Sequence, residues 1–207
     1  MNASRFLAIS AAALLVGQSA IADTAAPDAL IRQISDDTIA SIKQDSAIQA
    51  GDVGRAAALV EAKVVPYFDF RRITQLAMGA GWRSATLEQQ GEVTTQFRQL
   101  LVRTYSAALS NYRDQTIEIR PVRAKPTDEE VTVRSFIKQA GAEPLAIEYD
   151  LERTDEGWKI FDVRVAGVSL VASYRTTFAA EVRDHGVEGL IGLLAAKNRK
   201  AVKAVRM

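Results

Sequence analysis

The clearest structural signal in this chain is a two-residue period in residues 116–165, which read TIEIRPVRAKPTDEEVTVRSFIKQAGAEPLAIEYDLERTDEGWKIFDVRV. Apolar and polar side chains alternate there in four runs, separated by turn-type sequences such as Pro126–Asp128 and Thr154–Gly157. Alternation of this kind is typical of strands with one buried face and one solvated face. Because the connections are short, we expect these four strands to form an antiparallel sheet.

Helical spacing of apolar residues occupies the sequence on both sides of this stretch. Upstream it predicts helices over residues 28–49, 52–64, 69–79 and 87–112, and downstream over 171–182 and 187–197. The longest helix should begin with a capping box, in which Thr86 and Gln89 each satisfy the other's backbone amide. Helices before and after a run of strands predict an α+β fold, with helices packed on one face of a four-stranded antiparallel sheet.

The composition excludes several kinds of functional site. The 207 residues include 26 Lys and Arg against 25 Asp and Glu, so the chain lacks the basic excess of a nucleic-acid binder. Cysteine is absent and His185 is the one histidine, which leaves no thiol nucleophile and no thiolate or multi-histidine metal site. His185 precedes Gly186 at a predicted helix end, where a structural role beside the helix dipole is favoured. We therefore expect no metal and no cofactor.

The first 22 residues have the pattern of a secretory signal peptide. Arg5 precedes an apolar run over residues 6–17, which is shorter than the ~20 residues that span a bilayer. Ala20-Ile21-Ala22 then matches a signal-peptidase cleavage site. We expect a signal peptide over residues 1–22, a single α+β domain over 23–197, a basic C-terminal tail over 198–207, and a location in the periplasm.

The apolar surface of the predicted elements leaves three functions open. Helix 87–112, the sheet and helix 171–182 each carry a wide apolar face. If these faces do not interdigitate, the gap between them is an apolar pocket suited to an alkyl ligand. If they do, the chain is a structural adaptor with a filled core. A third reading is an enzyme that uses a buried carboxylate, for which Asp162 in the apolar fourth strand is the candidate.

Two blocks of short motifs run through the chain in a specific order. They are PYFDF (66–70), WRSAT (82–86) and TY (104–105) in the first block, and GWKIFDV (157–163) and GVSLV (167–171) in the second. With these motifs the chain resembles the MlaC (toluene-tolerance, Ttg2-type) family of periplasmic phospholipid-binding proteins, auxiliary components of an ABC transport system. The likeness runs from about residue 28 to residue 197.

The resemblance implies an NTF2-like α+β domain with an apolar pocket that takes the acyl chains of a diacyl phospholipid. It implies a carrier without catalytic activity. Its expected partners are an outer-membrane lipoprotein–porin complex and an inner-membrane ABC transporter complex with MCE-domain subunits. Lipid exchange between the two complexes would maintain the lipid asymmetry of the outer membrane.

Apolar residues on the expected inner faces are the candidates for lining this pocket. Arg164 and Arg175 are possible neighbours of the headgroup, although surface salt bridges are the favoured role for both. The expected lipid-binding residues are Phe70, Ile73, Met78, Trp82, Phe97, Leu100, Leu101 and Tyr105 on the helices, Val133, Ile147, Tyr149, Leu151, Val163 and Val165 on the strands, and Val168, Leu170, Tyr174 and Phe178 after them.

Overall fold

The computed structural model of the chain describes residues 26–110, 112 and 114–205, so the expected signal peptide lies outside the described residues. Within the described part, no helix is long and apolar enough to cross a bilayer. The elements are α1 (Pro27–Gln44), α2 (Ser46–Gln49), α3 (Val53–Lys63), the 3₁₀ turn η1 (Val65–Tyr67), α4 (Phe70–Met78), α5 (Gly81–Ser84), α6 (Leu87–Ser110), β1 (Thr116–Ile119), β2 (Glu130–Lys138), β3 (Leu145–Thr154), β4 (Gly157–Val165), β5 (Val168–Ser169) and α7 (Leu170–Val205).

The strands form one antiparallel sheet in the order β1-β2-β3-β4-β5. The expected α+β class is confirmed, but the expectation of four strands is wrong by one. The additional strand β5 pairs Val168 with Val165 across a tight turn. Ala166 and Gly167 form this turn with φ angles of 49° and 81°, and the chain reverses there at once. Two paired residues are too few to produce a recognisable alternation, so the sequence pattern could not reveal β5.

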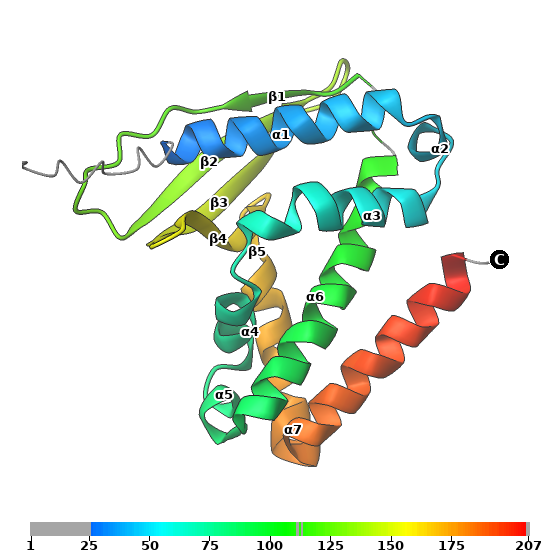
Figure 1. Cartoon of the computed structure of the whole chain (residues 1–207), viewed down its shortest axis with the longest axis vertical. Coiled ribbons are helices and arrows are strands. Elements are labelled where there is room, and N and C mark those ends of the chain that lie inside the picture. Colours follow the sequence, from blue (N-terminus) through cyan, green and yellow to red (C-terminus); the bar gives the residue numbers. More distant parts are fainter. Residues whose placement is uncertain (1–25, 111, 113, 206–207) are drawn as a thin grey trace, which may run out of the picture.

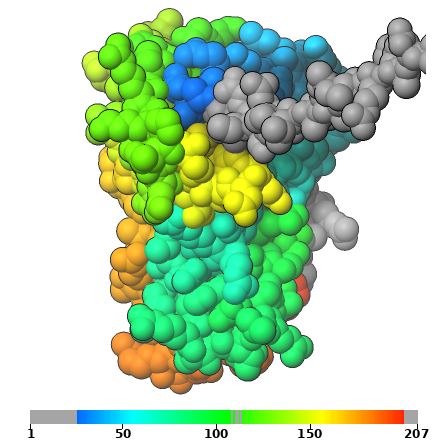
Figure 2. Space-filling view, turned by 60° about the vertical axis from the view of Figure 1, so that its left-hand side comes forward, coloured from blue at the N-terminus to red at the C-terminus, as the bar shows by residue number. Residues whose placement is uncertain are grey.

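The helices form two groups that lie differently relative to the sheet (Figure 1). Helix α1 lies along the sheet and packs against β1 and β2. Helices α4, α6 and α7 pack on one another and extend away from the sheet. Figure 2 shows the yellow turn between β3 and β4 seated between α1 above and the cyan-to-green helices α4–α6 below.

Side-chain caps set the starts of several helices, as the sequence predicts. Asp52 accepts a hydrogen bond from the Arg55 amide at the start of α3, and Asp69 accepts one from the Arg72 amide at the start of α4. These caps satisfy amides that the first turn of a helix leaves without a partner.

The predicted capping box of α6 is confirmed. The Gln89 amide donates to Thr86 Oγ1 at 3.1 Å, and the Thr86 amide donates to Gln89 Oε1 at 3.0 Å. The continuous helix expected over residues 28–49 is wrong. Asp45 adopts an extended backbone and accepts from the amides of Ala47 and Ile48, so it ends α1 and caps the separate helix α2.

Helix α7 consists of two arms joined by a kink at Gly186, where φ is 70° and ψ is −176°. The predicted helix end at this glycine is confirmed by its non-helical backbone. A left-handed φ of this kind favours glycine, which has no side chain to clash. His185 closes the first arm and its Nδ1 lies 2.9 Å from Glu181 Oε1. The second arm continues to Val205. It therefore passes the expected domain end at residue 197 and includes most of the basic segment that we expected as a tail.

The largest core cluster lies among the helices, away from the sheet. Phe97 of α6 is fully buried, and its ring makes edge-on contacts with the rings of Tyr174 and Phe178, at 4.8 Å between centroids in both cases. A second cluster joins α1 to the sheet through residues such as Ile31, Val133 and Leu151. The first cluster fills the space among α4, α5, α6 and α7, and the second lies between α1 and the sheet.

Candidate functional site

A cavity of about 780 Å³ lies between α1, the inner face of the sheet, the last part of α6 and the start of α7. Its walls are mostly apolar, with residues such as Ile34 of α1, Leu109 of α6 and Ile147 of β3. Protein interiors are close-packed and hold few voids larger than a water molecule. A space of this size is within the range of small-molecule binding sites, so we interpret it as a binding site.

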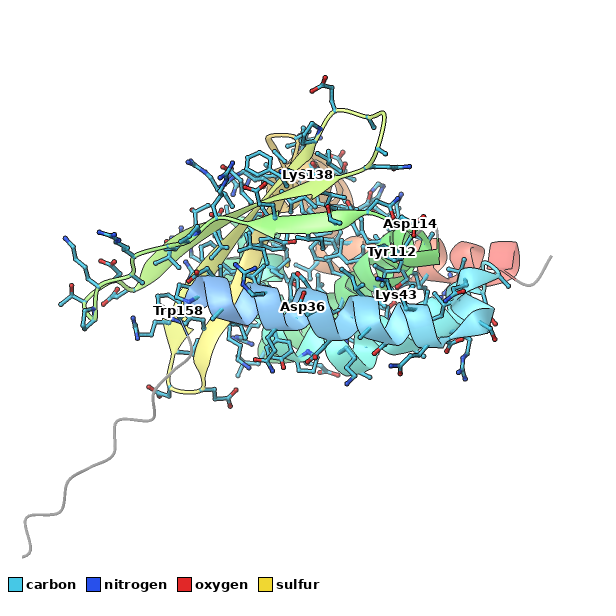
Figure 3. All side chains as sticks on the ribbon, turned by 90° about the horizontal axis from the view of Figure 1, so that it is seen from above. Asp36, Lys43, Tyr112, Asp114, Lys138 and Trp158 are labelled. Atoms are coloured by element: carbon cyan, nitrogen blue, oxygen red, sulfur yellow. The ribbon has the colours of Figure 1, made fainter. Side chains whose placement is uncertain are left out.

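The two ends of the cavity differ in polarity. One end is lined by Ile31, Phe68 and Ile160, and the buried Trp158 belongs to the same core cluster. The lining of the opposite end includes Tyr112, Gln115, Gln139 and Glu143. Figure 3, viewed from above, shows α1 beside the sheet, with Trp158 near one end of this helix and Tyr112 and Lys43 near the other.

Polar groups at the second end are joined by hydrogen bonds. The Tyr112 hydroxyl donates to the Gln115 carbonyl at 3.1 Å. The Gln115 side-chain amide donates to Gln139 Oε1 at 3.3 Å. A smaller, more polar hollow adjoins this end and shares Ile42 and Tyr112 with the cavity.

The cavity opens to solvent through a rim of exposed apolar side chains. Tyr105, Leu145, Val165 and Val168 line the cavity and are 48%, 40%, 39% and 64% exposed. Among the described residues, Leu87 is the only other large apolar side chain with comparable exposure. Apolar side chains that gather in this way on a surface mark a place where a ligand or partner binds.

Seven of the expected pocket residues line this cavity. They come from α6, the strands β3 to β5 and the start of α7. They are Tyr105, Ile147, Tyr149, Val163, Val165, Val168 and Leu170.

The remaining expected pocket residues lie outside the cavity lining. Most of them pack into the cluster around Phe97, where the faces of α4, α6 and α7 fill the space between them. Helical spacing shows that a face is buried, but not which element covers it. From the sequence alone, side chains of the packed core therefore look the same as side chains that line a cavity. This group comprises Phe70, Ile73, Met78, Trp82, Phe97, Leu100, Leu101, Tyr174 and Phe178 in that cluster, and Val133 and Leu151 in the cluster under the sheet.

Helix α1 supplies a wall of the cavity that the sequence analysis missed. Its lining residues follow one helical face and include two hydroxyl side chains, those of Ser35 and Thr38. The apolar stripe of this helix was visible in the sequence, but its position against the sheet was not. The missed lining residues of α1 are Ile31, Ile34, Ser35, Thr38, Ile39 and Ile42.

The electrostatics of the sheet separate a neutral inner face from a charged outer face. Burial raises the pKa of the Tyr149 and Tyr105 hydroxyls, which keeps these two side chains of the cavity wall uncharged at neutral pH. On the outer face, Arg164 Nε donates to Glu148 Oε2 at 2.8 Å, and its Nη2 donates to Asp150 Oδ1 at 2.9 Å. The hydrogen bond from Arg164 holds the pKa of Glu148 below its ordinary value.

Neither arginine considered as a headgroup neighbour lines the cavity. Arg164 is held in the ion pairs of the outer face. Arg175 is exposed, and its Nε donates to the Leu76 carbonyl at 3.3 Å.

Asp162 is buried and its carboxylate is fully engaged in local structure. Oδ1 accepts from the Val163 amide at 2.8 Å and from the Val171 amide at 3.1 Å, and Oδ2 accepts from the Ser169 hydroxyl. These bonds join β4 to the start of α7. Asp162 is not among the residues that line the cavity, and the described residues contain no cluster of His, Cys, Asp and Glu that could hold a metal ion.

Comparison with known proteins agrees with this architecture. The family model described as MlaC protein matches residues 32–196. The chain is 25% identical over 182 residues to the intermembrane phospholipid transport system binding protein MlaC of Haemophilus influenzae, covering 86% of this chain and 85% of that protein. It is 26% identical over 125 residues to the toluene tolerance protein ttg2D of Pseudomonas putida, which is 58% of each chain.

A solved structure has the same fold. The phospholipid-binding protein from Ralstonia solanacearum, determined in complex with a phospholipid, superposes with a TM-score of 0.80 at 38% identity. The match covers 86% of this chain and 99% of that one. Because the family model also spans most of the chain, the chain belongs to the MlaC family.

Proposed function

We propose that this chain is a periplasmic phospholipid carrier that holds the acyl chains of a diacyl phospholipid in the cavity between α1 and the sheet. The observation that carries the proposal is the open, largely apolar cavity of about 780 Å³. The phospholipid complex of the Ralstonia solanacearum relative supports the choice of ligand. The signal-peptide pattern in residues 1–22 supports the location.

The energetics of acyl chains explain why such a carrier needs a cavity and no catalytic group. Each methylene buried in apolar surroundings contributes about 0.8 kcal/mol. Two long chains with roughly 30 carbons would therefore cost on the order of 25 kcal/mol to leave in water. The walls of the cavity replace the apolar surroundings that the bilayer provides, and the open rim lets the lipid enter and leave.

The proposed partners are an outer-membrane lipoprotein–porin complex and an inner-membrane ABC transporter complex with an MCE-domain subunit. A carrier without its own energy source only equilibrates lipid between the two. The direction of flow then depends on the relative affinities of the partners and on ATP use by the transporter. In this way the carrier would maintain the lipid asymmetry of the outer membrane.

Native mass spectrometry of the secreted protein tests the proposal directly. The full chain is expressed with its own N-terminal segment, purified gently without detergent, and its bound lipids are extracted with solvent and identified. We expect a bound mass equal to one diacyl phospholipid. A lipid-free mass, together with no uptake from phospholipid vesicles, would contradict the proposal.

Asp162→Ala distinguishes a structural role of this carboxylate from a catalytic one. Removing it leaves the buried Val171 amide and the Ser169 hydroxyl without their acceptor, so we expect a loss of about 1–3 kcal/mol in the free energy of unfolding. The folded fraction should keep its bound lipid. Urea denaturation and lipid extraction measure the two effects, with Asp155→Ala in the exposed β3–β4 turn as control. Unchanged stability would contradict the structural role.

A further inference from the structure

Thr38 of α1 has a buried hydroxyl without a hydrogen-bond partner. The residue is 6% exposed, and its Oγ1 has no partner among the described residues. The other two buried hydroxyls in described helices are satisfied, because Thr74 donates to the Phe70 carbonyl and Ser106 to the Val102 carbonyl. A buried polar group normally has a hydrogen-bond partner. The described part of the protein supplies none for the Thr38 hydroxyl, which points to a partner on a bound ligand.

The side chain of Thr38 forms part of the cavity wall, between the two ends of different polarity. Ile31 and Ile34 precede it on the same wall towards the apolar end. Ile42 follows it, and belongs to the core cluster against which Tyr112 of the polar end packs. Along the cavity, the hydroxyls of Ser35 and Thr38 therefore lie between the mostly apolar end and the end that holds amide, phenol and carboxylate groups.

A diacyl phospholipid has the same order of chemistry, with apolar chains, ester carbonyls and then a polar headgroup. Thr38 lies about 10 Å along α1 from Ile31, at 1.5 Å per residue. One leaflet of a bilayer has about 15 Å of hydrocarbon. Acyl chains whose ester groups lie at Thr38 are therefore long enough to reach the apolar end of the cavity, with the headgroup towards Tyr112 and the open rim.

We propose that the Thr38 hydroxyl donates a hydrogen bond to an acyl ester carbonyl of the bound lipid and so sets the depth at which the lipid sits. This assignment rests on the proposed function. The oxygen is closed off from solvent in the structure, so the assignment requires Thr38 to exchange between the two χ1 rotamers that threonine adopts in a helix. The ester oxygen then satisfies it, and the carrier distinguishes ester-linked lipids from ether-linked lipids, which have no carbonyl.

A competition between two lipids tests this assignment. Lipid-free protein is incubated with vesicles of equimolar diester and diether phosphatidylethanolamine of equal chain length, and the bound lipids are then extracted and counted. For the natural sequence we expect about a 3- to 10-fold preference for the diester, which corresponds to one ordinary hydrogen bond. Thr38→Val keeps the branched shape and removes the hydroxyl, so its preference should fall to about 1.

Ser41→Ala is the control on the same helix. Ser41 lies about one turn from Thr38 but outside the cavity lining, and its hydroxyl already donates to the Asp37 carbonyl at 2.8 Å. Its removal should leave the diester preference unchanged. Thr38→Val should also unfold at the same or a higher temperature in the lipid-free state, because it loses a hydroxyl that has no partner.

Each result has a definite meaning. Equal uptake of the two lipids by the natural sequence, or a preference that persists in Thr38→Val, would overturn the assignment while leaving the carrier function in place. A lower unfolding temperature of lipid-free Thr38→Val would show a partner within the protein and would also overturn it. If no variant takes up either lipid, the proposed function itself fails.

Discussion

Ile147→Glu is expected to give a folded protein that no longer retains phospholipid. Ile147 lines the cavity, opposite Ser135 on β2 and Val165 on β4. In the empty protein, water in the open cavity solvates the new carboxylate. An acyl chain would remove that water and leave an unpaired charge, at a cost of several kcal/mol. We expect lipid retention to fall by at least about 100-fold.

The measurement compares bound lipid by native mass spectrometry and solvent extraction, with circular dichroism as a check of folding. Leu87→Glu is the control, because it makes the same kind of substitution at a side chain that is 79% exposed at the start of α6. It should keep both its fold and its lipid. An Ile147→Glu protein with the lipid content of the natural sequence would remove Ile147 from the binding surface.

Phe97→Ala should have the largest effect on stability and little effect on lipid content. Phe97 is 0% exposed and packs edge-on against the rings of Tyr174 and Phe178. Truncation of a buried phenylalanine to alanine typically costs about 3–5 kcal/mol. Since domains are stable by only about 5–15 kcal/mol, the midpoint of urea denaturation should fall sharply. The protein that remains folded should still carry lipid, because Phe97 lies outside the cavity lining.

Tyr105→Ala, about two turns further along α6, should show the opposite combination. Tyr105 is 48% exposed and belongs to the rim of the cavity. Its truncation leaves no buried void, so the loss of stability should be well below that of Phe97→Ala. Its lipid content should be lower, because the mouth loses apolar surface. Loss of lipid in folded Phe97→Ala, with normal lipid in Tyr105→Ala, would contradict the placement of the two residues.

The sequence reveals those parts of the fold that depend on local chemistry. Local chemistry predicted the starts of α3, α4 and α6, since each cap needs only a side chain and an amide within three residues. Strand alternation predicted four of the five strands, because it too is a pattern among neighbouring residues. Asp45 was missed as a helix break, because its neighbours on both sides continue the helical spacing.

The cavity depends on contacts that no local pattern contains. Phe97 and Tyr105 lie on one stripe of α6, yet one is enclosed by α4 and α7 and the other lies at the mouth. Helix α1 was recognised as amphipathic, but its position beside the sheet is set by packing between elements that are far apart in the sequence. The Asp162 side chain likewise acquires its partners only when α7 starts beside β4.

The order of the strands also has a consequence for folding kinetics. Every strand of the sheet pairs with its neighbour in the sequence, so the loops that must close are short and their entropic cost is small. Chains rich in such local contacts fold rapidly. When denatured, lipid-free protein is diluted into buffer, the sheet should therefore form early, and the cavity is completed only when α1 packs against it. The refolded protein offers a defined starting time from which the uptake of lipid can be followed.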